Sequence, residues 1–109
     1  MRDSGDFRHT IRRGAKAATP TLVAHVASGT DGPVSVGFVV SKQVGGAVER
    51  NRVKRRLRHL VRQRIETLPR GTQLVVRALP AAAGQRGRGP GLGDDLDVAL
   101  AAALKRSAR

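Results

Sequence analysis

The residues best suited to chemistry in this sequence form a run of positive charges near its middle. Eight of the fifteen residues from Arg50 to Arg64 are Lys or Arg, and none is acidic. Guanidinium groups grip phosphates through paired hydrogen bonds, so rows of them suit a phosphate backbone. Asn51 adds an amide that can read a base edge or a 2′-hydroxyl. The run therefore predicts binding to a nucleic acid.

The spacing of the run predicts which side faces a partner. Apolar residues recur at helical intervals from Val53 to Leu68, and Pro69 stops the pattern, which predicts a helix over about 47–68. At ~100° per residue, the side opposite the apolar stripe is a polar arc of roughly 60°. The arc comprises Asn51, Arg55, Arg58 and Arg62, with Arg52, Arg56 and His59 beside it and Lys54 and Arg64 at its margin. We expect the apolar stripe to pack on a sheet.

Two other interpretations of this helix fit its sequence less well than RNA binding does. A charged helix face is usually solvated and crossed by ion pairs, but the run from Arg50 to Arg64 contains no acids to form them. A helix that reads the DNA major groove usually carries several amides beside its arginines, whereas this one has only Asn51 and Gln63. RNA is therefore favoured, and no DNA partner is expected.

The rest of the sequence offers no catalytic or metal-binding set. There is no cysteine, and the three histidines do not have metal-ligand spacing. We interpret Asp94, Asp95 and Asp97 as first-turn acids of a helix, and Gly45-Gly46 as a tight strand-to-helix turn rather than a phosphate loop. We predict no catalytic residue and no protein-bound metal.

The composition indicates one small, strongly basic domain. The chain has 109 residues, 21 Lys and Arg against 8 Asp and Glu, and a formal net charge of +13, which predicts a single domain over 1–109 and a polyanionic partner. Two Phe and no Trp or Tyr leave little aromatic surface for stacking bases. No stretch reaches the ~18 apolar residues of a membrane helix, so we expect a cytoplasmic protein that does not contact membranes.

Three apolar runs predict strands around the basic helix. Thr21 to Ser28 and Val34 to Ser41 flank a Gly/Pro-rich turn and look like a hairpin, and Thr72 to Leu79 is a third strand. Their alternation gives one apolar face for helices and a second face of small and mixed residues that is fit to be open. His25 and Arg77 belong to the second face.

The two ends of the chain add further elements. Phe7 and Ile11 share one face of an expected N-terminal helix that ends at Gly14. The composition of Pro80 to Gly93 predicts a flexible Gly/Arg-rich linker. A last helix is expected from about Asp94 onward.

The segment from Ser41 to Arg55 resembles the signature of the bacterial ribonuclease P protein component. It contains Ser-Lys at a strand end, then Gly, Ala-Val, Arg-Asn-Arg and Lys-Arg in one ungapped run. The N-terminal, strand and C-terminal patterns fit the same family. The resemblance implies an α/β (α+β) sandwich of roughly four strands and three helices with a left-handed βαβ crossover.

The resemblance also implies a division of labour with RNA. In that family the catalytic RNA subunit holds Mg²⁺ and hydrolyses precursor tRNA to free its mature 5′ end, while the protein binds the RNA subunit and the 5′ leader. The resemblance assigns RNA contacts to Arg50, Asn51, Lys54, Arg55 and Arg58, and we add Lys42, Arg52 and Arg62 to the set. It assigns the leader cleft to Phe7, Ile11 and His25, to which strand alternation adds Arg77.

Two proteins of other classes would share parts of this pattern. A ribosomal protein of similar architecture would share the charge but would have no reason to keep an open cleft opposite its basic helix. A DNA-binding regulator would share the basic helix. The expectation remains the ribonuclease P protein.

Overall fold

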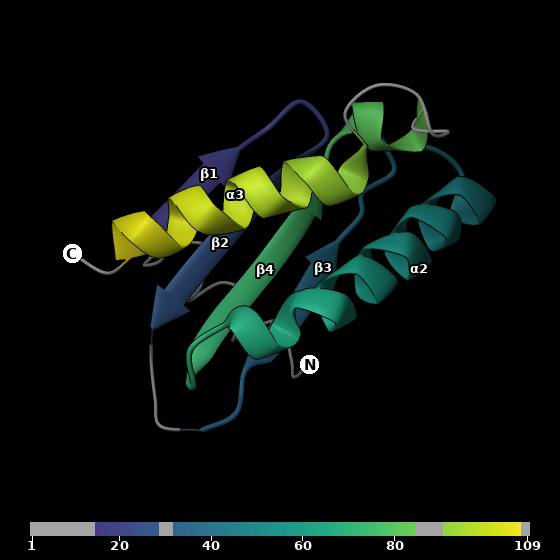
Figure 1. Ribbon diagram of the computed structural model, residues 1–109. Coiled ribbons are helices and arrows are strands. Elements are labelled where there is room, and N and C mark those ends of the chain that lie inside the picture. The colour runs from purple at the N-terminus through teal and green to yellow at the C-terminus, as the bar shows by residue number, and fades with distance from the viewer. Residues whose placement is uncertain (1–14, 29–31, 85–90, 108–109) are drawn as a thin grey trace.

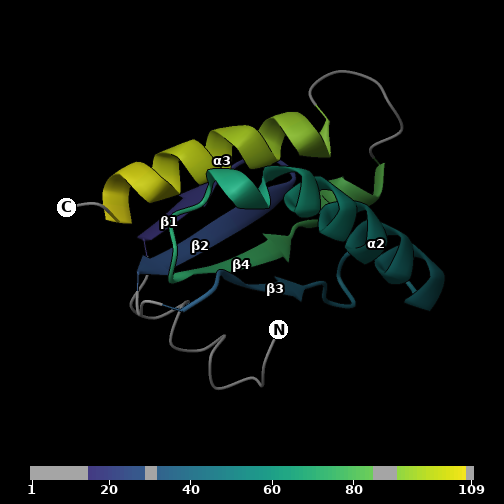
Figure 2. The same ribbon diagram turned by 60° about the horizontal axis from the view of Figure 1, so that its bottom comes forward.

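The structure is a computed structural model that describes residues 15–28, 32–84 and 91–107, and it has two layers (Figure 1). The strands are β1 (Ala15–Ala18), β2 (Leu22–Ser28), β3 (Ser35–Val39) and β4 (Thr72–Ala78). The helices are α2 (Ala47–Arg64) and α3 (Leu92–Ser107), with 3₁₀ turns η1 (Ile65–Thr67) and η2 (Pro80–Gly84). Both α-helices cover the same face of the sheet (Figures 1 and 2). The expected helix containing Phe7 and Ile11 lies outside the described residues.

The strand order of the sheet is β1-β2-β4-β3. β2 pairs antiparallel with β1 and with β4, whereas β3 pairs parallel with β4. The predicted hairpin of Thr21 to Ser28 with Val34 to Ser41 is therefore wrong, because these runs form β2 and β3 and β4 lies between them. Alternation assigns residues to faces of a sheet, but it does not say which strands are neighbours.

The connection from β3 through α2 to β4 has an uncommon hand. In Figure 1 the helices lie in front of the sheet, the arrows of β3 and β4 point upward, and β4 lies to the left of β3. This arrangement is a left-handed crossover, whereas parallel connections are right-handed in nearly all folds. The resemblance described above implies this left-handed crossover.

The core lies between the helices and the apolar face of the sheet. Leu22, Leu74, Leu57 and Leu96 are completely buried there. Burial of each such leucine contributes ~1.5–3 kcal/mol. The other buried members are Ala17 from β1, Ala24 and Val26 from β2, Val76 and Ala78 from β4, Val53 and Val61 from α2, Leu92, Ala99, Leu100 and Ala103 from α3, and Val44, Leu68 and Ala82 from segments outside these strands and α-helices. The predicted apolar face is confirmed, although Val36 and Phe38 on the edge strand β3 are only partly buried.

The opposite face of the sheet is less open than its alternation predicted. Arg77 is exposed there, but His25, Gly37 and Val75 are buried. None of the described helices covers this face (Figure 2). The two faces therefore differ in that the described helices cover only one of them. Both faces contain buried residues.

Several predicted boundaries shift in the structure. The basic helix ends at Arg64 and continues only as the 3₁₀ turn η1, and α3 begins at Leu92. The structure describes the two ends of the predicted linker: Pro80–Gly84 forms η2 with Ala82 buried, and Leu92 and Gly93 belong to α3. β1 was not foreseen as a strand, because only Ala17 of its four residues is buried. No described helix is both long and apolar enough to cross a membrane.

A buried carboxylate joins the C-terminal helix to the sheet. Asp95 accepts hydrogen bonds from the backbone N–H and the hydroxyl of Thr21, the residue just before β2. Both residues are buried, so neither donor can turn to water instead. Asp95 therefore fixes the start of α3 against β2.

We predict that Asp95→Ala lowers the free energy of unfolding by ~1–3 kcal/mol, because it leaves two buried donors of Thr21 without an acceptor. Urea denaturation followed by circular dichroism measures the change. Asp94→Ala is the matched control, since Asp94 lies in the same turn but is exposed. Equal losses for the two variants would contradict the role of Asp95.

Candidate nucleic-acid interface

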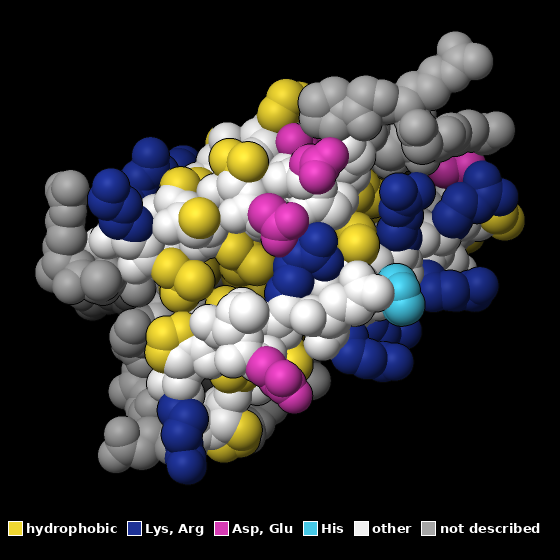
Figure 3. Space-filling model, viewed as in Figure 1, with side chains coloured by type: hydrophobic (Ala, Val, Ile, Leu, Met, Phe, Trp, Pro, Cys, Tyr) yellow, Lys and Arg dark blue, Asp and Glu magenta, His cyan; other side chains and the backbone are white. Residues whose placement is uncertain are grey.

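The polar side of α2 carries a cluster of exposed basic side chains. Lys and Arg side chains gather over α2, whereas acidic side chains gather over the first turns of α3 (Figure 3). We call the following exposed residues of α2 the basic face: Asn51, Arg52, Lys54, Arg55, Arg58 and Arg62. All six belong to the predicted RNA-binding set. Lys42, from the same set, is exposed in the turn before α2.

The orientation of α2 is determined by its buried apolar stripe and by the turn that precedes the helix. Val53, Leu57 and Val61 pack into the core, which leaves the basic face on the opposite side. Gly45 precedes the helix with φ of 155°, and a Cβ at Gly45 would lie 2.9 Å from Cβ of Glu49. Only glycine fits this approach without a shift. The pair Gly45-Gly46 is thus a strand-to-helix turn, as predicted.

Few of the cations on α2 are neutralised within the fold. Arg52 pairs with Glu49 at 3.1 Å, one turn before it. Arg64 grips Asp97 of α3 with two nitrogens, and this contact holds the pKa of Asp97 below its ordinary value. Within the described part of the chain, no ion pair involves Arg50, Lys54, Arg55, Arg58 or Arg62. These cations are available to an external anion.

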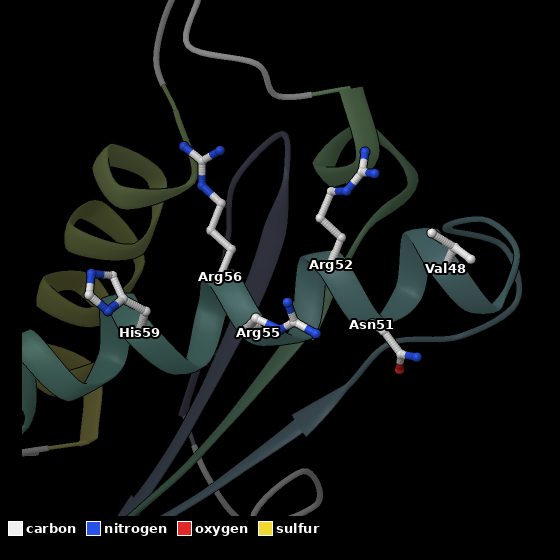
Figure 4. Close-up of a pocket in the computed structure, with 6 residues that line it drawn as sticks. All are labelled: Val48, Asn51, Arg52, Arg55, Arg56 and His59. Carbon is white, nitrogen blue, oxygen red and sulfur yellow. The ribbon is translucent and has the colours of Figure 1, made fainter.

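Two hollows flank the basic face, and Asn51 borders both. The larger, of about 540 Å³, is lined by Val48, Asn51, Arg52, Arg55, Arg56 and His59 (Figure 4). The smaller, of about 180 Å³, lies where β3 leads into α2 and is lined by Val40, Ala47, Arg50, Asn51 and Lys54. The basic face is therefore contoured rather than a smooth convex helix.

Arg50 differs from the other arginines in its burial. Its Nε atom is buried and has no hydrogen-bond partner among the described residues. Its position on the helix is close to the apolar stripe, so its stem is covered while it borders the smaller hollow. A phosphate in that hollow would give the guanidinium the acceptor that the described fold does not provide.

The sequence did not indicate a role for Val48, and it did not place Arg56 or His59 in the predicted RNA-binding set. Val48 is 73% exposed and lines the larger hollow, and Arg56 and His59 line it too. The sequence feature that could have indicated Val48 is its position, an apolar residue on the polar side of the helix. The spacing alone did not show that these side chains enclose a hollow.

His25, expected in the leader cleft, lies near two cations on the sheet face that no described helix covers. It pairs across strands with Lys16, while Arg77 lies opposite the nearby Val23. Its Nδ1 is buried with no hydrogen-bond partner in the described residues. Burial, followed by repulsion from Lys16 and Arg77, lowers the pKa of His25 below its ordinary value of 6.5. Phe7 and Ile11, the other expected cleft residues, lie outside the described part.

The described residues contain no group of three or more His, Cys, Asp or Glu side chains that could hold a metal ion. All three acids at the start of α3 are engaged: Asp94 accepts a hydrogen bond from the backbone N–H of Gly91, Asp95 accepts from Thr21, and Asp97 pairs with Arg64. They act as structural contacts of α3.

Comparisons with known proteins point to one family. A family model described as Ribonuclease P matches residues 1–89. The ribonuclease P protein component of Streptomyces avermitilis is 48% identical over 118 residues, covering 100% of this chain and 94% of the relative. That of Beutenbergia cavernae is 56% identical over 84 residues, covering 76% of this chain and 71% of the relative.

Solved structures agree with the fold. The RNase P protein from Thermotoga maritima matches with a TM-score of 0.70 and 27% identity over 97% of this chain and 94% of its own. The Staphylococcus aureus RNase P protein matches with a TM-score of 0.73 and 22% identity over 98% of this chain and 93% of its own, which bears on the fold alone.

The depressed pKa of His25 predicts a pH-dependent stability. As the pH falls below about 6.5, the unfolded chain takes up a proton at this residue before the folded chain does, so the free energy of unfolding decreases, by at most ~1.4 kcal/mol per pH unit. The decrease stops below the folded pKa. Urea unfolding between pH 5 and pH 8 measures it.

His25→Gln should flatten this dependence, because the buried titrating group is then gone. A profile that is the same in wild type and His25→Gln would show that His25 is not buried neutral.

Proposed function

This chain belongs to the ribonuclease P protein family, and from that membership we propose that the basic face of α2 binds the RNA subunit of the enzyme. Ribonuclease P is the ribonucleoprotein endoribonuclease that frees the mature 5′ end of tRNA, and this chain is its protein component. A ribosomal or DNA-binding role is not favoured, since the family match covers most of the chain.

The observation that carries the RNA-binding proposal is the set of unneutralised cations on one helix. Arg55, Arg58 and Arg62 are exposed on the basic face with no ion pair among the described residues. Their mutual repulsion opposes folding, and a phosphate backbone would relieve it. Lys42 and Arg50 extend the same charge toward the start of the helix.

We propose that the chemistry belongs to RNA and that Mg²⁺ is held there. Within the described residues the acids of α3 do not form a ligand set, because Asp95 and Asp97 serve the fold. The role of this chain is to bind and position. The proposal places the complex in the cytoplasm, where precursor tRNA is its other partner.

The second proposed contact is with the 5′ leader, on the face of the sheet that no described helix covers. Arg77 is exposed there on β4, His25 lies on the neighbouring strand β2, and Lys16 pairs with His25 from β1. An extended strand of RNA suits this face, because its phosphates meet Lys16 and Arg77. Phe7 and Ile11, which lie outside the described residues, are the other residues that we propose for this contact.

Removal of two arginines from the basic face should reduce the electrostatic part of binding. Arg55→Ala combined with Arg58→Ala should lower the slope of log affinity against log salt by about two, since each lost phosphate contact removes about one unit or slightly less. Filter binding to the RNA subunit over roughly 50–400 mM KCl measures this slope. Lys105→Ala, exposed on α3, is the control. An unchanged slope in a folded double variant would exclude this face from the interface.

The leader contact predicts a loss confined to leader-bearing substrate. Arg77→Ala should weaken holoenzyme binding to precursor tRNA and lower its salt slope by about 0.7, the value for one phosphate of a single strand, without affecting mature tRNA. Phe7→Ala and His25→Ala should reduce the same preference while assembly with the RNA subunit persists.

Binding of precursor substrates with and without a leader, at fixed salt, tests this contact. If an Arg77→Ala holoenzyme loses affinity equally for both substrates, the residue acts through folding or assembly rather than through the leader.

A further inference from the structure

The larger hollow on α2 contains side chains that a phosphate backbone does not require. Val48 and His59 stand at its two ends, and Arg52, Arg55 and Arg56 lie between them (Figure 4). Val48 is 73% exposed, although most apolar residues of α2 face the core. A hollow built only for phosphates would have no use for a valine at this place.

Helix geometry aligns these residues along one line. At ~100° and ~1.5 Å per residue, Val48 and His59 point within about 20° of each other and lie roughly 16 Å apart along the axis. Their direction is opposite that of Leu57, which is completely buried. The hollow therefore runs along the outermost line of the helix, where a partner can reach it without moving any other element.

The rims of the hollow carry polar and positively charged side chains, which suit RNA. Arg52 and Arg56 extend to one side of the helix, and Asn51 extends to the other (Figure 4). The ring of His59 lies next to Gln63, with 3.4 Å between their Nε2 atoms, so a polar neighbour one turn later can orient it. The hollow thus combines phosphate donors, an amide, an aromatic ring and an aliphatic surface.

The form of RNA determines whether these groups have partners. An A-form duplex presents phosphates and 2′-hydroxyls and keeps its base faces stacked inside, so it would leave Val48 and His59 without contacts. Unpaired nucleotides expose base faces that stack on rings and base edges that amides can read. The composition of the hollow fits unpaired nucleotides.

We propose that this hollow binds a single-stranded stretch of the RNA subunit, with one base stacked on His59 and another packed against Val48. The proposal rests on the RNA-binding role of the basic face and specifies the kind of RNA that it meets. The arginines between the two ends contact the phosphates that link these bases, and Asn51 contacts a base edge.

Exposure of an apolar side chain does not by itself carry the proposal. Val98 is 62% exposed on α3, yet it lines neither of the two hollows and its helix carries acids in its first turn. Isolated apolar residues on a surface are ordinary. Val48 differs from Val98 because it shares a hollow with three arginines and an imidazole.

Base contacts and phosphate contacts separate in their response to salt. We expect His59→Ala to weaken binding of the RNA subunit by about 5- to 150-fold, the range for loss of one stacked base, with the salt slope unchanged. His59→Phe should retain or strengthen binding, because a phenyl ring also stacks. Val48→Ala should weaken binding by about 2- to 10-fold, and the matched control Val98→Ala should have no effect.

A footprint on the assembled holoenzyme identifies the form of RNA directly. Reagents that modify the pairing edges of unpaired bases should find bases that wild-type protein and His59→Phe protect and that His59→Ala leaves reactive. Hydroxyl-radical protection of the riboses should stay the same in all three complexes.

The outcomes separate this proposal from the RNA-binding role itself. If His59→Ala binds as wild type, or if no unpaired base changes its reactivity, the hollow does not bind single-stranded RNA, even while Arg55→Ala with Arg58→Ala still lowers the salt slope. If the arginine variants also leave the slope unchanged, the basic face is not the interface, and both proposals fail together.

Discussion

The packing of one apolar stripe of α2 against the sheet determines the orientation of every charged residue on that helix. Val53, Leu57 and Val61 are buried in the core, and a helix has no freedom to turn once three such residues are fixed. Rotation by a single residue would move a guanidinium into the core, which is far more costly than any surface contact. The basic face is therefore a consequence of core packing.

The same constraint explains why the charge is tolerated. The cations of α2 repel one another, and the described structure neutralises few of them. The fold compensates with contacts elsewhere, namely the leucine-rich core, the bond between Asp95 and Thr21, and the pair of Arg64 with Asp97 that ties α2 to α3. The acids that could have neutralised the basic face instead support the helix beside it.

The sequence predicts best what depends on periodicity. The basic helix, the apolar face of the strands and the strand-to-helix turn at Gly45 follow from spacing, and the structure has all three. The predicted hairpin failed because pairing of β2 with β4 joins residues about 50 positions apart, and alternation carries no record of such partners. β1 was missed because its alanines contrast little with their surroundings.

The candidate site was predictable in its direction but not in its detail. Helical spacing places Arg55, Arg58 and Arg62 outward, and they are exposed. It does not show that Arg52 turns to Glu49, that the Nε of Arg50 is buried, or that Val48 joins a hollow with His59. These features depend on side-chain conformations and on neighbours in other elements.

A tethered cleavage reagent tests most directly whether α2 faces RNA. The chain has no cysteine, so a single cysteine carrying an iron chelate can be placed at Gln63 on α2 or at Val98 on α3, both exposed. In the assembled holoenzyme, hydroxyl radicals from Gln63→Cys should cut the RNA subunit at a few clustered nucleotides, while Val98→Cys should cut it weakly or not at all. Strong cuts from Val98→Cys with none from Gln63→Cys would contradict the account, because α3 would then be the helix that meets the RNA.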